Sequence, residues 1–182
     1  MATFVLIRHG EKHHWHDGCP PSDIQVENYQ DDHKLSGKGR ERALGLAGYF
    51  QRPIWTKLFQ QRPLECLVAQ DVDTTFGIGK SERPKATLLP MQEQLKLPLE
   101  LFPKRNVREM VEHLLSERFI GKSVVICWSH QGMSELASML GVVDPPSKWP
   151  KKRYDVTWLI QQESNGSCQF NQLDQKILFG DE

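Results

Sequence analysis

Two apolar runs in the sequence each end in a histidine that is followed closely by glycine. The first run, Thr3–Ile7, leads into Arg8-His9-Gly10, and the second, Ser123–Trp128, leads into Ser129-His130-Gln131-Gly132. A continuous apolar run is typical of a strand that is covered on both faces. Because ligands bind at the carboxyl ends of the strands in open parallel sheets, neighbouring strands would bring the two imidazoles to one crevice.

A second arginine is expected at the same edge of the sheet. Arg83 follows a third apolar run, Leu64–Ala69, and comes just before a predicted helix. Two arginines and two histidines that face one another without a carboxylate repel strongly when desolvated, so they need an anion. Phosphate suits the planar, forked donors of arginine. Any one of these side chains alone is typical of a solvated surface, and the prediction of a phosphate site depends on all four together: Arg8, His9, Arg83 and His130.

The elements that must position these residues alternate between strands and helices. Helices are predicted from an N-cap at Ser36 to Phe50, from Ser81 to Leu95, from an N-cap at Asn106 to Phe119, and from Gln131 to Leu140. This alternation indicates the α/β class, a three-layer sandwich with a mainly parallel central sheet flanked by helices. Two more strands, at residues 155–161 and 168–174, are joined by Asn165-Gly166, which is a strong hairpin signal.

Three local signals refine the helix predictions. Pro84 falls in the first turn of the helix at residues 81–95, where proline is favoured, whereas Pro90 is expected to kink or divide that helix. Asn106 and Glu109 have the spacing of a capping box. The last of the four helices should end at Gly141.

Length, charge and cysteine content limit the classes of function. The chain has 182 residues, which favours a single domain at residues 1–182. Lys+Arg and Asp+Glu both number 23, so no overall field would attract nucleic acid or an anionic membrane. The four cysteines are scattered, and no signal peptide or membrane-spanning run is recognised, so we expect a reduced, cytoplasmic protein.

Four motifs, in order along the chain, resemble those of the histidine phosphatase superfamily, also called phosphoglycerate mutase-like. They are the first strand with Arg8-His9-Gly10-Glu11, then Leu35-Ser36-x-x-Gly39-x-x-x-Ala43, Ser81-x-Arg83-Pro84-x-x-Thr87, and Trp128-Ser129-His130-x-Gly132. The resemblance implies a phosphoglycerate mutase-like fold and a phosphatase that needs no metal or cofactor. It implies a small-molecule or protein phosphate as substrate and gives no oligomeric state. It also implies that His9 is the nucleophile and that Arg8, Arg83 and His130 hold the phosphate oxygens.

Physical reasoning supports these roles independently. A histidine can attack only as a neutral imidazole, and nearby cations disfavour its protonation. The same cations offset the charge on the equatorial oxygens of the transferring phosphoryl group. Water would then hydrolyse phospho-His9. Gly10 is expected to leave room for the phosphate to approach.

The sequence does not supply an obvious general acid. In the superfamily's acid phosphatase branch an aspartate follows the second histidine, but here Gln131 follows His130. Of Glu93, Glu100 and Glu109, the best candidate acid is Glu100, in the predicted loop LPLELFPKRN, but we favour the interpretation that it is a solvated loop carboxylate. A weak or absent acid would favour leaving groups that need little protonation, such as those of phosphohistidine or acyl phosphates.

Two further polar segments allow two interpretations each. His13, His16 and Cys19 have a spacing that invites a metal hypothesis, but because no second ligand cluster accompanies them we favour a polar loop over the pocket. The basic segment Lys151-Lys152-Arg153 suggests a solvated face or a grip on a polyanionic substrate.

Two other functions compete with the phosphatase. An inactive relative could keep the anion pocket to hold a phosphorylated ligand or partner, as a binding module. A phosphoglycerate mutase ranks lower, because the chain is short for one and lacks an evident acid segment.

Overall fold

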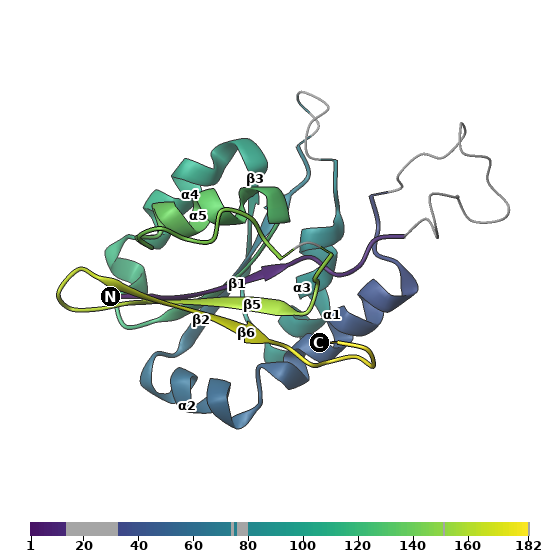
Figure 1. Ribbon diagram of the computed structural model, residues 1–182, viewed down its shortest axis with the longest axis horizontal. Helices are drawn as coiled ribbons and strands as arrows, with labels where there is room; N and C mark the ends of the chain where they lie inside the picture. The colour runs from purple at the N-terminus through teal and green to yellow at the C-terminus, as the bar shows by residue number, and fades with distance from the viewer. Residues whose placement is uncertain (14–32, 74, 76–79, 151, 182) are drawn as a thin grey trace, which may run out of the picture.

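A central sheet of six strands lies between two layers of helices (Figure 1). The computed structural model describes residues 1–13, 33–73, 75, 80–150 and 152–181. The strands are β1 (Thr3–Arg8), β2 (Leu64–Asp71), β3 (Leu99–Pro103), β4 (Ser123–Trp128), β5 (Val156–Gln162) and β6 (Cys168–Asp174). Their order across the sheet is β3-β2-β4-β1-β5-β6. The pairs among β3, β2, β4 and β1 are parallel, while β5 and β6 add an antiparallel hairpin beside β1.

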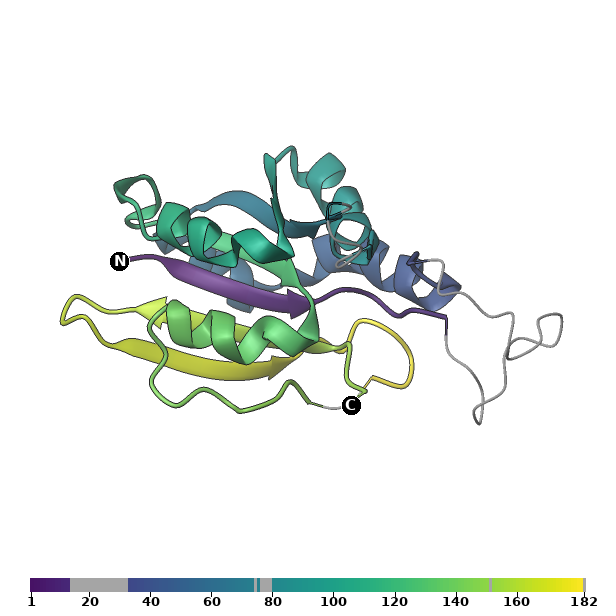
Figure 2. The same cartoon turned by 90° about the horizontal axis from the view of Figure 1, so that it is seen from above.

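Helices cover both faces of this sheet. They are α1 (Gly37–Tyr49), α2 (Pro53–Gln61), α3 (Arg83–Leu95), α4 (Val107–Leu114) and α5 (Met133–Met139), with short 3₁₀ turns at Lys104–Asn106, Glu117–Phe119 and His130–Gly132. In Figure 1, α4 and α5 lie on one side of the strands and α1, α2 and α3 on the other. The view from above shows α4 and α5 side by side across the sheet (Figure 2).

Alternating residues of the buried strands fill two separate cores. Phe4 and Leu6 of β1 pack into the core under α4 and α5. Val5 and Ile7 pack into the core under α1, α2 and α3. Because successive side chains of a strand point to opposite faces, a strand buried on both faces reads as an unbroken apolar run. The prediction of an α/β three-layer sandwich with a mainly parallel sheet is therefore confirmed.

Two local predictions need correction. Pro90 does not divide its helix, because α3 runs through it to Leu95, while a kink at Pro90 stays a prediction. The missing N–H removes only the bond to the Ala86 carbonyl, and both residues are partly exposed, so water can replace that bond. Asn106 does stand at the N-cap of α4, but its side chain caps no backbone N–H and instead donates to the carboxylate of Glu109.

Two elements were missed by the sequence analysis. β3 was taken for a loop, because it is a short edge strand that follows Pro98, ends with Pro103 and pairs only with β2. α2 was not predicted at all, although its single fully buried residue, Trp55, stands three and four residues before Leu58 and Phe59, which is helical spacing.

Cys66, Cys127 and Cys168 are free, and Cys19 lies outside the described residues. None of the helices described has the length and apolar character that crossing a bilayer requires.

Candidate active site

The register of the sheet brings the two histidine motifs to one edge. β1 and β4 are parallel neighbours whose last paired residues are Arg8 and Trp128. The two strands therefore end at the same level of the sheet. β1 continues into His9, and β4 continues into Ser129 and His130. The Ser129 N–H donates to Oε1 of Gln70 at the end of β2, at 3.3 Å, which joins the third strand to this edge.

Helix α3 is fixed to the end of β1 by one hydroxyl group. Arg83 is the first residue of α3, and one turn later the Thr87 Oγ1 donates to the Arg83 carbonyl at 2.7 Å. The same oxygen accepts the Gly10 N–H at 2.9 Å. Thr87 is buried, so these bonds are shielded from water. The start of α3 is thereby held directly beside the His9–Gly10 peptide.

The four predicted site residues line one cavity, which we call the His9 pocket. Its volume is about 370 Å³. The described residues that line it are Arg8, His9, Lys12, His33, Gln70, Lys80, Ser81, Arg83, Pro84, Lys104, Ser129, His130 and Gln131. No aspartate or glutamate is among them, so the described lining is cationic and suited to an anion.

His9 is held as one neutral tautomer. Its Nδ1 lies 2.8 Å from the Gly10 carbonyl oxygen, which can only accept, so Nδ1 carries the proton and Nε2 keeps its lone pair. Burial is the main cause that lowers the pKa of His9 to about 3, and the charges of Arg8 and Arg83 lower it further, while the hydrogen bond to the Gly10 carbonyl acts in the opposite direction. Near neutral pH the ring is therefore an unprotonated base.

His130 is also held neutral. Burial is the largest cause that lowers its pKa to about 4, followed by the charges of Arg8, Lys12 and Lys104. Its Nδ1 is buried and has no hydrogen-bond partner among the described residues. Arg8 Nε and Ser129 Oγ are in the same condition. Buried polar atoms normally find partners, so three together indicate a place for a ligand that forms hydrogen bonds.

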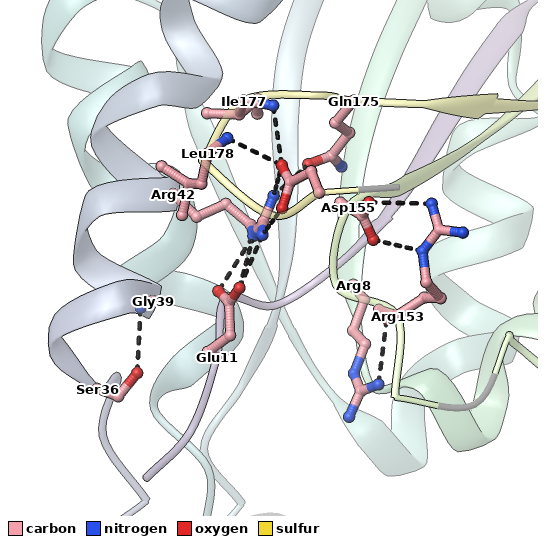
Figure 3. Close-up of polar contacts among 12 residues, drawn as sticks. Arg8, Glu11, Ser36, Gly39, Arg42, Arg153, Asp155, Gln175, Ile177 and Leu178 are labelled. Atoms are coloured by element: carbon pink, nitrogen blue, oxygen red, sulfur yellow. Dashed lines mark hydrogen bonds and ion pairs between the residues drawn. The ribbon is translucent and has the colours of Figure 1, made fainter. Parts of the chain in front are cut away.

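Arg8 is oriented from the side of β5. Its Nη1 donates to the Arg153 carbonyl at 3.2 Å, and its guanidinium lies 3.8 Å from the centroid of the Tyr154 ring. Arg153 in turn pairs with Asp155, at 2.6 Å between Nε and Oδ1 (Figure 3). The interpretation of Lys151–Arg153 as a solvated face is therefore wrong for Arg153, whose backbone and side chain support the pocket. Lys151 lies outside the described residues.

Gly10 has a different function from the one expected. A Cβ on Gly10 would lie 2.7 Å from the Gly39 carbonyl oxygen, and a Cβ on Gly39 would lie 2.3 Å from the Glu11 oxygen. The two glycines allow the chain after β1 to pass against the first turn of α1. Ser36 caps that turn by accepting the Gly39 N–H at 3.1 Å. The room that Gly10 provides is thus taken by backbone.

A buried ion-pair network fixes the residue that follows Gly10. Arg42 of α1 donates to Glu11 on one side and to Asp181 on the other, each with an N···O distance of 2.7 Å (Figure 3). All three side chains are at most 5% exposed. Asp181 also accepts the backbone N–H groups of Ile177 and Leu178. Sequence reasoning missed this network, because its members are far apart along the chain.

Glu100 does not belong to the pocket. It lies inside β3, opposite Val68, and accepts from His113 Nε2 and Arg118 Nη1, both at 2.8 Å. The prediction of a pocket-bordering loop carboxylate is therefore wrong, because edge-strand pairing fixes Glu100 within the sheet rather than at its carboxyl edge.

The metal hypothesis stays a hypothesis. His16 and Cys19 lie outside the described residues. Elsewhere in the described chain, no three histidine, cysteine, aspartate or glutamate side chains form a group that could hold a metal ion.

Comparison with solved structures relates this geometry to known proteins. The protein histidine phosphatase SixA complexed with tungstate aligns over 95% of this chain and 97% of its own, at a TM-score of 0.57 and 16% identity. The alpha-ribazole phosphatase from Shigella flexneri aligns over 99% of both chains, at a TM-score of 0.54 and 13% identity. The chain has the histidine phosphatase fold. By sequence, no family model and no curated protein matches it. The resemblance seen in the four motifs is thus confirmed for the fold.

The ion-pair network predicts that Arg42, Glu11 and Asp181 contribute to the free energy of unfolding as a coupled group. Arg42→Met leaves Glu11 and Asp181 buried without their cation, so we expect a loss of about 3–5 kcal/mol in the free energy of unfolding, measured with urea. In a Glu11→Gln background the same change should cost less. Arg40→Met, on the exposed side of α1, is the matched control and should cost under about 1 kcal/mol. Equal losses from Arg42→Met in both backgrounds would contradict the network.

The neutral His9 predicts how stability depends on pH. Because folding lowers the pKa of His9 from its ordinary 6.5 to about 3, its contribution is complete above pH 6.5 and is lost as the pH falls toward 3. Between pH 6 and pH 5 this costs up to about 1.4 kcal/mol per pH unit. His9→Ala should flatten the urea-derived slope by that amount, whereas replacing the exposed His13 should not. An unchanged slope in His9→Ala would be the contrary result.

Proposed function

We propose that the chain is a phosphatase that works through a phosphohistidine at His9. The observation that carries the proposal is the tautomer of His9: with Nδ1 donating to Gly10, the lone pair of Nε2 is left for attack. The cations and hydrogen-bond donors needed for a phosphoryl group line the same cavity. Solved proteins with this fold include two described as phosphatases, one of them in complex with tungstate, an oxyanion.

The first chemical step forms a bond from His9 Nε2 to phosphorus while the bond to the leaving oxygen or nitrogen breaks. Arg8 and Arg83 offset the charge on the three equatorial oxygens, and His130 contributes hydrogen bonding from the β4 side. In the second step, the oxygen of a water molecule bonds to phosphorus and the P–N bond breaks. Inorganic phosphate is released, and Nε2 regains its lone pair.

The cationic pocket suits an anionic substrate and a neutral nucleophile at the same time. Arg8 and Arg83 disfavour protonation of His9, so it stays reactive near neutral pH. A bound phosphate compensates the same charges. Neither function needs a metal or a cofactor, and we propose none for the reaction.

The proposed mechanism predicts a phosphoenzyme. With 4-nitrophenyl phosphate, whose leaving group needs no proton donor, we expect turnover and an acid-labile phosphoprotein. His9→Ala should lower turnover by at least about a thousandfold and abolish the labelled species, measured by quenching in alkaline detergent after reaction with radiolabelled phosphate ester and then showing that acid releases the label. His13→Ala is the matched control and should keep both.

Three results would contradict this function in different ways. Turnover that survives in His9→Ala would remove the proposed nucleophile. Tight binding of inorganic phosphate without turnover would favour the binding module. Transfer of the phosphoryl group from the enzyme to a sugar acid would favour a mutase.

The lining of the His9 pocket predicts which leaving groups the enzyme accepts. No described residue of the His9 pocket is a carboxylic acid, so we propose substrates whose leaving group needs little protonation, such as phosphohistidine or acyl phosphates. Aryl and acyl phosphates should exceed alkyl phosphates in kcat/KM by about 10²–10⁴, the usual contribution of a general acid. Glu100→Gln should change neither class by more than about twofold, because Glu100 is engaged in β3. Comparable rates for both substrate classes would reject this.

A further inference from the structure

A second cavity adjoins the His9 pocket and shares part of its wall. We call it the lysine groove; its volume is about 860 Å³. Arg8, Lys12, His130 and Gln131 line both cavities. The groove adds Ser134, Ser147, Lys148, Trp149, Lys152 and Tyr154. A molecule with its phosphate at His9 can therefore reach the groove past Arg8 and His130.

The charged side chains that line the two cavities among the described residues are all basic. Five lysines and two arginines line them: Arg8, Lys12, Lys80, Arg83, Lys104, Lys148 and Lys152. No aspartate or glutamate is among the described lining residues of either cavity. The whole chain has 23 basic and 23 acidic residues, so net charge does not explain this. The positive field is local to the cavities.

This charge exceeds what one phosphate can offset. A phosphate ester carries about −1.5 to −2 charges at neutral pH, and Arg8 and Arg83 already match that. Lys12 and Lys104 are close enough to His130 to lower its pKa, so they add to the field at the pocket. Lys148 and Lys152 extend it along the groove, where both are exposed.

The floor of the groove is rigid, whereas its lysines are adaptable. Trp149 and Tyr154 are both buried, and Trp149 Nε1 donates to the Arg153 carbonyl at 2.9 Å, the same oxygen that Arg8 contacts. The groove and the His9 pocket are thus fixed relative to each other through one carbonyl. Long lysine side chains above such a floor can follow an anion of variable position.

We propose that the lysine groove binds a second anionic group, a phosphate or a carboxylate, on the same small molecule whose phosphoryl group reaches His9. The inference rests on the proposed function, because that function places the first phosphate in the His9 pocket. It narrows the substrate to small molecules with at least two anionic groups. Lys148 and Lys152 are the residues that select them.

The test measures binding, so it does not depend on turnover. Inorganic phosphate, pyrophosphate and tripolyphosphate are titrated calorimetrically into the full chain at about 0.1 M ionic strength. We expect tripolyphosphate to bind at least about tenfold more tightly than phosphate. In Lys148→Gln/Lys152→Gln this ratio should fall by about three- to tenfold, the effect of losing two partly solvated ion pairs.

A charge-matched variant separates the groove from general electrostatics. Lys57→Gln/Lys96→Gln removes two exposed lysines outside both cavities and should keep the wild-type ratio within about twofold. An unchanged ratio in the groove variant, or an equal fall in the control, would overturn the inference. Tripolyphosphate binding as expected without a phospho-His9 would remove the proposed phosphatase and leave the groove intact.

Discussion

The site depends on one electrostatic constraint. Two arginines and two histidines, from the ends of β1 and β4 and the start of α3, are enclosed together in the His9 pocket. Arginine side chains stay protonated in proteins, so the two histidines are the groups that lose their protons. Burial and nearby cations hold both imidazoles neutral, with pKa values of about 3 and 4 for His9 and His130. The neutral ring of His9, which burial favours most and the neighbouring arginine charges favour further, is the form that can act as a nucleophile.

Contacts outside the His9 pocket hold the backbone in place against the repulsion among the pocket's cations. Thr87 ties the start of α3 to Gly10, and the two facing glycines bring the chain after β1 against α1. Arg42 then fixes Glu11 in a water-poor network that reaches the C-terminal segment. These contacts hold the backbone immediately after His9, at Gly10 and Glu11. The backbone that carries the cations is therefore fixed by contacts that lie outside the pocket.

The sequence predicted the parts of this arrangement that depend on strand pattern. Thr3–Ile7 and Ser123–Trp128 read as doubly covered strands, and parallel pairing then places His9 and His130 together, as the register shows. Predictions from single residues did less well. Glu100 was misplaced because a short edge strand between prolines looks like a loop, and Pro90 was tolerated within α3 because its helix face is partly solvated.

Contacts between distant segments could not be read from the chain. Arg42 and Asp181 are 139 residues apart, and the Arg153 carbonyl reaches Arg8 across 145 residues. Only the assembled sheet and the returning C-terminal segment bring them together. The same holds for the lysine groove, because Lys12, Lys148 and Lys152 meet only after β5 has paired with β1.

The protonation state of His9 is the most direct test of this account. Nitrogen-15 NMR of the free protein at pH 5 distinguishes imidazolium from each neutral tautomer, at a pH where an unperturbed histidine, with a pKa of about 6.5, is almost fully protonated. The account predicts that His9 is neutral there, with the proton on Nδ1 and a free Nε2. An imidazolium, or a neutral ring protonated on Nε2, would contradict it.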